Sequence, residues 1–311
     1  MLGVGASMTE VVGGTPLVQL REVVPDGAAD VFVKLEWFNP TGSYKDRMAL
    51  ATIEEAERRG DLRTGMTVLE YTGGSTGSSL AFVCAVKGYR FLAVSSDAFA
   101  EEKLKTMKAF GAEIVMVASD GGQITGDLVP RLIAKATELA ADPNVYFTDQ
   151  LNNADMQLGY RAVGHEILEQ LDRPVDVFCA SVGTSHFALG TATGLSEGGS
   201  EARIVVFEPA TTAVISGNQP GTHHVEGIGI GFVPPMLDPN RYDEVRAIDE
   251  EDARRMARRL TLEEGLFAGV SSGLNIAGAV QIAKDLGQGH TVVTAAVDTG
   301  LKYLAGSLYN T

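Results

Sequence analysis

The chain has 311 residues, 45% of them hydrophobic, which is enough to bury a large core in one large or two ordinary domains. Its formal net charge of −15 at pH 7 repels nucleic-acid phosphates and anionic lipid headgroups, so we exclude both as partners. No apolar run approaches the roughly 18 residues of a membrane span, and the N-terminus lacks the pattern of a signal peptide.

Strand-like and helix-like segments alternate along almost the whole chain. Runs that are apolar on both faces and separated by helical patterns are typical of parallel strands covered on both sides. The sequence therefore predicts an α/β fold with doubly wound parallel sheets. The expected strands cover residues 31–37, 67–72, 89–96, 112–119, 145–149, 175–182, 203–209 and 290–298. Cys84 and Cys179 lie in such apolar runs, which predicts buried thiols in a reducing compartment, by default the cytoplasm.

The segment 34–50, KLEWFNPTGSYKDRMAL, places one lysine at a chemically useful position. Turn residues end the strand, Ser43 is a good N-cap, and apolar residues then recur at helical spacing up to Gly60. Lys45 is thus predicted in a first helical turn, where the helix dipole disfavours its protonated form and lowers its pKa. An ordinary surface lysine is the alternative that this segment alone leaves open.

The residues around Lys45 resemble the cofactor-lysine motif of the cysteine synthase and cystathionine β-synthase family, the fold-type II enzymes that use pyridoxal 5′-phosphate. The matching residues are Asn39, Pro40, Ser43, Lys45, Asp46 and Arg47. The resemblance implies a tryptophan synthase β-like fold and a homodimer. It also implies that Lys45 carries the cofactor as a Schiff base and later moves the substrate's α-proton.

The resemblance extends from Gly14 to Tyr303 and implies two domains. A smaller mobile domain with the substrate loop is expected at residues 41–150. A larger domain that binds the cofactor phosphate is expected at residues 9–40 plus 151–311.

The glycine-rich segment 72–77, TGGSTG, follows an expected strand and precedes a helix expected to begin near Ser78. Such a loop offers hydroxyls and free amides to an anion such as a substrate carboxylate. It resembles the family's substrate-binding loop, and Gln150 matches the family's carboxylate-binding glutamine. The substrate-binding residues implied are Thr72, Gly73, Ser75, Thr76 and Gln150. Ser75 stands where the family usually has an asparagine that contacts the cofactor, so Ser75 is also a predicted cofactor ligand.

The segment 183–187, GTSHF, matches the family's phosphate-binding loop in position and length. His186 replaces a glycine, and Phe187 replaces a threonine whose hydroxyl would bind phosphate. We expect the phosphate to be bound by Gly183, Thr184, Ser185 and His186, since a helix N-terminus with small residues before it favours an anion. A surface histidine is the open alternative for His186.

Three further segments complete the predicted site. Residues 220–238 are too rich in glycine and proline for a regular element and resemble the segment that lines the family's active-site mouth. Ser271 matches the serine that hydrogen-bonds the cofactor's pyridine nitrogen, a neutral partner that favours elimination at the β-carbon over transamination. His223 and His224 have no accompanying ligands at metal-site spacing, so no metal is expected.

The resemblance implies β-replacement on an activated serine of the O-acetylserine type, through an aminoacrylate, with sulfide as the nucleophile and L-cysteine as the product. The departures at Ser75, His186 and Phe187 leave open a different nucleophile and a specialised amino acid as the product. A lyase or dehydratase that releases ammonia and a keto acid is a third hypothesis. A non-catalytic relative that binds a partner protein is the fourth.

Overall fold

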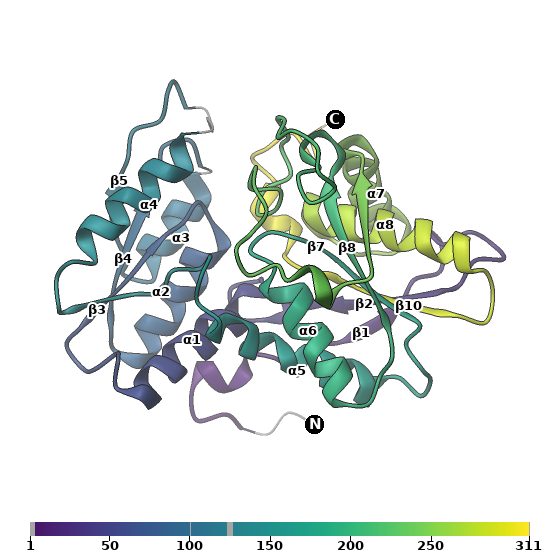
Figure 1. Cartoon of the computed structure of the whole chain (residues 1–311), viewed down its shortest axis with the longest axis horizontal. Coiled ribbons are helices and arrows are strands. Elements are labelled where there is room, and N and C mark those ends of the chain that lie inside the picture. Colours follow the sequence, from purple (N-terminus) through teal and green to yellow (C-terminus); the bar gives the residue numbers. More distant parts are fainter. Residues whose placement is uncertain (1–3, 100, 123–126, 311) are drawn as a thin grey trace. The chain divides into compact units, whose positions relative to one another are not determined.

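A computed structural model describes residues 4–99, 101–122 and 127–310. The chain divides into two compact units, of which one contains the residues up to Val12 together with Lys45–Gly159. The other contains Gly13–Tyr44 and the residues from Tyr160 onwards. Each unit is built around its own β-sheet (Figure 1). The roles predicted for residues 41–150 and for the rest of the chain stay predictions.

The first unit contains a four-stranded parallel sheet in the order β5-β4-β3-β6. Its strands are β3 (Thr67–Tyr71), β4 (Arg90–Ser95), β5 (Glu113–Met116) and β6 (Val145–Phe147). Its helices are α1 (Lys45–Arg59), α2 (Ser75–Lys87), α3 (Glu101–Ala109) and α4 (Leu128–Leu139). Helix α2 packs between α1 and α3, and both α2 and α4 contact β3 and β4 (Figure 1). A further helix, α5 (Asp155–Gln170), begins in this unit and ends in the other.

The second unit contains a six-stranded sheet in the order β1-β2-β10-β7-β8-β9. Its strands are β1 (Leu17–Gln19), β2 (Asp30–Leu35), β7 (Val177–Ser181), β8 (Arg203–Pro209), β9 (Glu244–Ile248) and β10 (Thr291–Ala296). Its other helices are α6 (His186–Glu197), α7 (Glu250–Glu263) and α8 (Val270–Leu286). The largely buried α8 packs against β2, β7, β8 and β10, with α7 alongside it (Figure 1).

The predicted α/β fold with parallel sheets is confirmed, and every predicted strand is present. Two edge strands of the second unit were missed. Strand β1 is only three residues long and pairs antiparallel with β2, so this otherwise parallel sheet has one antiparallel edge. Strand β9 is mostly half-buried, and it therefore lacks the continuous apolar pattern that marks the central strands.

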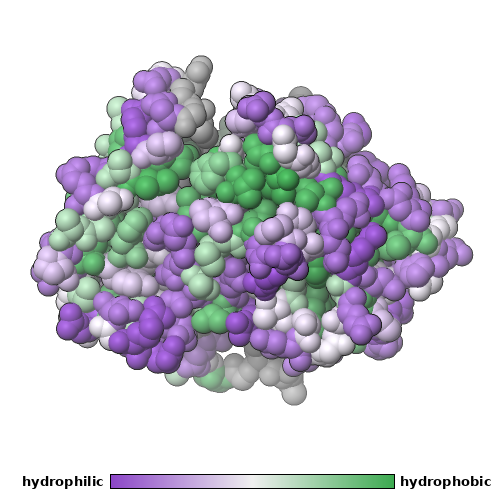
Figure 2. Space-filling view, in the orientation of Figure 1, coloured by the Kyte–Doolittle hydropathy of each residue, from purple (hydrophilic) through white to green (hydrophobic). Residues whose placement is uncertain are grey.

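Both cysteines are buried, as predicted, and burial raises the pKa of each thiol to about 12. Hydrophilic side chains are spread widely over the face of the molecule seen in Figure 2, with apolar patches between them. None of the helices in the described part of the chain is long and apolar enough to cross a membrane.

Candidate active site

Lys45 is the first residue of α1, and its side chain is only 7% exposed. Burial lowers the pKa of Lys45 to about 8, while the nearby charge of Glu70 acts in the opposite direction. The surface-lysine alternative is therefore wrong, and burial is the main cause of the lowered pKa. Helix α1 begins two residues after Ser43, the predicted N-cap, and Ser43 pairs in a bridge with Asp298.

Glu70 is a fully buried carboxyl group near the end of β3. One of its oxygens accepts a hydrogen bond from the backbone N of Tyr71 at 2.9 Å. The other accepts from Thr148 Oγ1 at 2.7 Å and from the backbone N of Gln150 at 2.9 Å. Burial raises the pKa of Glu70 to about 8, although all three hydrogen bonds favour the ionised form.

The predicted substrate loop, residues 72–77, turns directly into α2. The helix begins at Ser75, earlier than the predicted start near Ser78. The hydroxyl of Thr72 accepts hydrogen bonds from the backbone N of Gly74 and of Gly77, each at 3.2 Å. This hydroxyl holds the chain in a tight turn, so that helical geometry is reached within the glycine-rich segment itself.

Side chains on and just before α3 occupy the space that a β-carbon would need at the glycines of this loop. Lys103 and Met107 are four residues apart on one face of α3, and Phe99 comes just before this helix. An added β-carbon would lie 2.5 Å from Phe99 at Gly73, 2.9 Å from Lys103 at Gly74 and 2.4 Å from Met107 at Gly77. Such distances leave no space for a larger residue unless a side chain moves.

Gln150 follows β6 and comes together with the substrate loop as predicted. Its Nε2 donates to the backbone O of Tyr71 at 2.7 Å, and its Oε1 accepts from Thr76 Oγ1 at 3.0 Å. The preceding residue, Asp149, has a φ of 45°, in the left-handed region that non-glycine residues rarely adopt. The amide of Gln150 is thus held at the first turn of α2, where free backbone N–H groups favour an anion.

The predicted phosphate loop lies between β7 and α6 in the second unit. Ser185, the N-cap of α6, has a φ of 72°, and its Oγ is buried without a hydrogen-bond partner among the described residues. Gly183 is also constrained, because an added β-carbon would lie 2.3 Å from the backbone O of Gly227. An unpaired buried hydroxyl at the N-terminus of a helix is well suited to an anionic phosphate group.

His186 and Phe187 are both buried in the first turn of α6, so the surface alternative for His186 is wrong. The centroid of the Phe187 ring lies 5.0 Å from that of Tyr44 and 5.2 Å from that of Tyr160, both in edge-on contact. It lies 6.2 Å from the ring centroid of Phe178. Phe187 is therefore part of an aromatic cluster. Because Tyr44 directly precedes Lys45, this cluster also fixes the residue before the start of α1.

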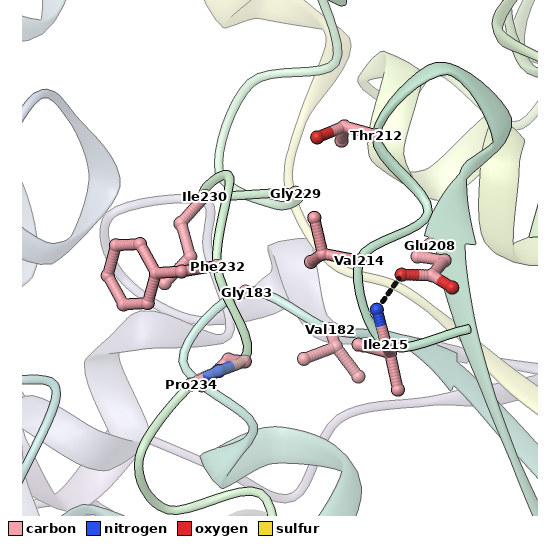
Figure 3. A pocket seen from close by; sticks show the side chains of 10 residues that line it. All are labelled: Val182, Gly183, Glu208, Thr212, Val214, Ile215, Gly229, Ile230, Phe232 and Pro234. Atoms are coloured by element: carbon pink, nitrogen blue, oxygen red, sulfur yellow. Dashed lines mark hydrogen bonds between the residues drawn. The ribbon is translucent and has the colours of Figure 1, made fainter. Parts of the chain in front are cut away.

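The segment 220–238 contains no helix or strand, as predicted, and part of it covers the start of the phosphate loop. The backbone N of Gly229 donates to the O of Val182 at 3.2 Å. Figure 3 shows Gly229, Ile230, Phe232 and Pro234 of this segment around a cavity that Gly183 and Glu208 also line. Its volume of about 10 Å³ leaves room for a single water molecule at most, so this cavity is no substrate pocket.

His223 belongs to the same segment, and its ring contacts two backbone groups of that segment. Its Nδ1 accepts from the backbone N of Val225 at 3.2 Å, and its Nε2 is 2.8 Å from the O of Gly229. The tautomer that satisfies both contacts carries its proton on Nε2. Within the described ranges, no three His, Cys, Asp or Glu side chains are placed to share a metal ion.

Ser271 lies in the first turn of α8 and is 4% exposed. The neighbouring Gly269 has no space for a side chain, because an added β-carbon would lie 2.4 Å from the ring of Tyr303 and 2.5 Å from Oδ1 of Asp298. Tyr303 in turn donates to Asp298 at 2.7 Å. The closing segment thus packs directly against the turn that presents Ser271.

Residues 8–298 match the model of the family described as pyridoxal-phosphate dependent enzyme. The chain belongs to this family. A cysteine synthase of Staphylococcus aureus is 41% identical over 306 residues, which cover 98% of this chain and 97% of the relative. The resemblance inferred from the sequence is therefore confirmed, and pyridoxal phosphate is the cofactor of the family.

Two solved structures extend the comparison. A cysteine synthase from Entamoeba histolytica matches with a TM-score of 0.93 and 32% identity, covering 99% of this chain and 92% of that one. An O-ureido-L-serine synthase matches with a TM-score of 0.90 and 34% identity, covering 99% and 96%. This family member thus shares its fold with two enzymes whose names state different products, cysteine and O-ureido-L-serine.

Two features of this pyridoxal-phosphate family member were missed in the sequence. Glu70 could have been found, because it is the one charged residue in the apolar strand TVLEY. The aromatic cluster around Phe187 could not, since its members come from three distant segments and each is an ordinary core residue by itself.

Proposed function

We propose that this protein is a cysteine synthase-like transferase that replaces the leaving group of an O-acetylserine-type donor with sulfide to give L-cysteine. The full-length similarity to a cysteine synthase carries this proposal. The buried Lys45, with its lowered pKa, supplies the amine that the chemistry requires. When bound, pyridoxal phosphate holds the substrate amine covalently and withdraws electrons from the α-carbon.

The residues of this chain divide the remaining work. Lys45 is proposed as the covalent anchor of the cofactor and as the base that removes the α-proton. The cofactor phosphate is assigned to the N-terminus of α6, with Gly183, Thr184, Ser185 and His186. The unpaired buried hydroxyl of Ser185 supports this assignment.

The other contacts follow the same reasoning. Ser271 is proposed to meet the pyridine nitrogen, and Ser75 to contact both cofactor and substrate. The substrate carboxylate is assigned to the first turn of α2 and the amide of Gln150, namely to Thr72, Gly73, Ser75, Thr76 and Gln150. The hydrogen bond from Thr76 to Gln150 supports a common role for these groups.

A second candidate is β-replacement with a different nucleophile. The similarity to an O-ureido-L-serine synthase favours it, as do the departures at Ser75, His186 and Phe187. Feeding a panel of nucleophiles to the enzyme and its donor, with sulfide as the reference, separates the two candidates.

The first experiment is the visible absorption spectrum of the purified holoenzyme, followed as O-acetyl-L-serine is added, with Lys45→Ala as the control. We expect a cofactor band in the wild type that shifts to longer wavelength with the donor, and no such shift in the variant. A wild type without a band after pyridoxal phosphate is supplied would contradict the proposed function. Pyruvate released without any nucleophile would instead favour the lyase hypothesis.

Two properties of the whole protein belong to the same proposal. The family resemblance implies a homodimer, which sedimentation of the holoenzyme would test. A cytoplasmic location is supported by two buried thiols whose pKa is raised to about 12, since such groups do not need an oxidising compartment.

A further inference from the structure

Glu70 is a carboxyl group that no step of the proposed reaction uses, although it lies fully buried beside the predicted carboxylate-binding residues. Burying a carboxyl group is costly unless its oxygens are hydrogen-bonded. The donors that meet Glu70 lie at the end of β3 and just after the end of β6, where the predicted substrate-binding residues begin.

The pairing of the two strands explains what Glu70 does there. The residue pairs of the parallel ladder between β3 and β6 end at Leu69 and Phe147, and the backbone N of Thr148 still donates to the O of Leu69 at 3.0 Å. The chain then passes through the left-handed Asp149. The backbone N of Gln150 emerges from this turn and donates to the side chain of Glu70 at 2.9 Å.

The hydrogen bond from the backbone N of Gln150 to Glu70 fixes the point from which the side-chain amide of Gln150 extends. With its backbone fixed by Glu70, the side chain of Gln150 reaches the O of Tyr71 at 2.7 Å and Thr76 Oγ1 at 3.0 Å. The backbone N of Tyr71 is itself bound to the other oxygen of Glu70 at 2.9 Å. One carboxyl group thus holds both the backbone N of Gln150 and the residue, Tyr71, to whose O the side-chain amide of Gln150 donates.

We propose that Glu70 is a positioning residue, which holds Gln150 in the orientation that receives the substrate carboxylate and so determines affinity for carboxylate-bearing amino acids. The proposal rests on the proposed function of Gln150. The charge of Asp149 raises the pKa of Glu70, and the charge of Glu70 raises the pKa of Lys45, the proposed anchor of the cofactor. Glu70 therefore also faces the charge of the residue that performs the chemistry.

Glu70→Gln is the informative variant. Glutamine has the size of glutamate but a single acceptor oxygen, so it cannot accept from Tyr71 on one side and from Thr148 and Gln150 on the other. Glu208→Gln is the matched control. Glu208 is 1% exposed at the end of β8 and accepts three hydrogen bonds, from the backbone N of Ile215 and from the N and Oγ of Ser216.

The measurement is the band shift of the holoenzyme on titration with L-serine and with L-serinamide, which lacks the carboxylate. We expect Glu70→Gln to bind L-serine about tenfold more weakly and L-serinamide as the wild type does, since one misplaced hydrogen bond to a charged group is worth about that factor. The KM for O-acetyl-L-serine is expected to rise by about the same factor, with kcat changed less than about threefold. Glu208→Gln is expected to weaken both ligands equally or neither.

A double variant tests whether Glu70 acts through Gln150. On a Gln150→Ala background, Glu70→Gln is expected to cause no further loss of L-serine affinity. The proposal is wrong if the two losses are independent, or if Glu70→Gln weakens the amide as much as the acid. If Glu70→Gln does not fold, Glu70→Asp, which keeps the carboxyl group but withdraws it from Gln150, is expected to give the same selective loss. A wild type that shows no cofactor band contradicts the proposed function instead, so the two failures are distinct.

Discussion

The loops that open α2 and α6 both follow a parallel strand and both present a helix N-terminus, yet different residues shape them. In the first loop, glycines allow the side chains of Phe99, Lys103 and Met107 to pack closely against the backbone. In the second, Ser185 adopts a left-handed conformation, and the buried His186 and Phe187 occupy the helix's first turn. Glycine is therefore needed where neighbours crowd the backbone, and can be replaced where a larger residue packs into the core.

The largest expected effect comes from removing the residue that most distinguishes the second loop. Phe187→Thr restores the residue type of the family but deletes a ring packed against Tyr44, Tyr160 and Phe178. We expect a loss of about 3 kcal/mol in the free energy of unfolding, because the deletion leaves a cavity. Denaturant unfolding of the cofactor-free protein measures it. Phe110→Thr is the control, with an expected loss of about 1 kcal/mol, since Phe110 is 37% exposed. Equal losses would contradict the importance of the cluster.

Lys45 lies in the first unit, and the predicted phosphate loop lies in the second. Covalent capture of the cofactor needs the neutral amine of Lys45, so its dependence on pH distinguishes this step from phosphate binding. The neutral amine is the nucleophile, and its pKa is lowered to about 8. The rate at which cofactor-free protein forms its visible band is therefore expected to rise nearly tenfold for each pH unit well below the pKa, by about 50-fold between pH 6 and 8, and to level off above about pH 9. Stopped-flow absorbance checks this, and a rate that keeps rising to pH 10 would show an ordinary lysine.

Gly183→Ala tests the one crowded glycine of the second loop. Its β-carbon would lie 2.3 Å from the backbone O of Gly227, and backbone cannot rotate aside as a side chain can. We expect affinity for pyridoxal phosphate to fall about 30-fold, equivalent to about 2 kcal/mol of overpacking. Absorbance titration measures it. Gly306→Ala, with its nearest contact at 3.6 Å, is the control and should bind the cofactor as the wild type does.

The smallest effect is expected at Gly73, the corresponding test in the first loop. An alanine β-carbon would lie 2.5 Å from the ring of Phe99, which is a side chain that can move. We expect the KM for O-acetyl-L-serine to rise about fivefold, or about 1 kcal/mol, with cofactor affinity unchanged. A change in cofactor affinity instead would mean that the backbone at Gly73 also supports cofactor binding.

The strands and the position of Lys45 could be predicted because each depends on local pattern. Buried parallel strands are continuous apolar runs, and turn residues followed by helical spacing indicate a helix start. The edge strand β1 escaped because three half-exposed residues carry no such pattern. The burial of His186 and the network of Glu70 escaped for another reason, since both depend on segments that are distant in sequence.

The order of the strands in the larger sheet has a consequence for biosynthesis. Strand β2 is made near the beginning of the chain, yet its parallel partner is β10, the last strand to be synthesised. All described residues of the first unit precede Tyr160, so that unit can fold while the ribosome is still translating. Strand β2 cannot pair with β10 until residue 296 has emerged from the ribosome. Completion of this sheet is therefore a late event that joins segments distant in sequence. A chain that stops before β10 would leave β2 without its parallel neighbour, and β7 with β8 alone beside it.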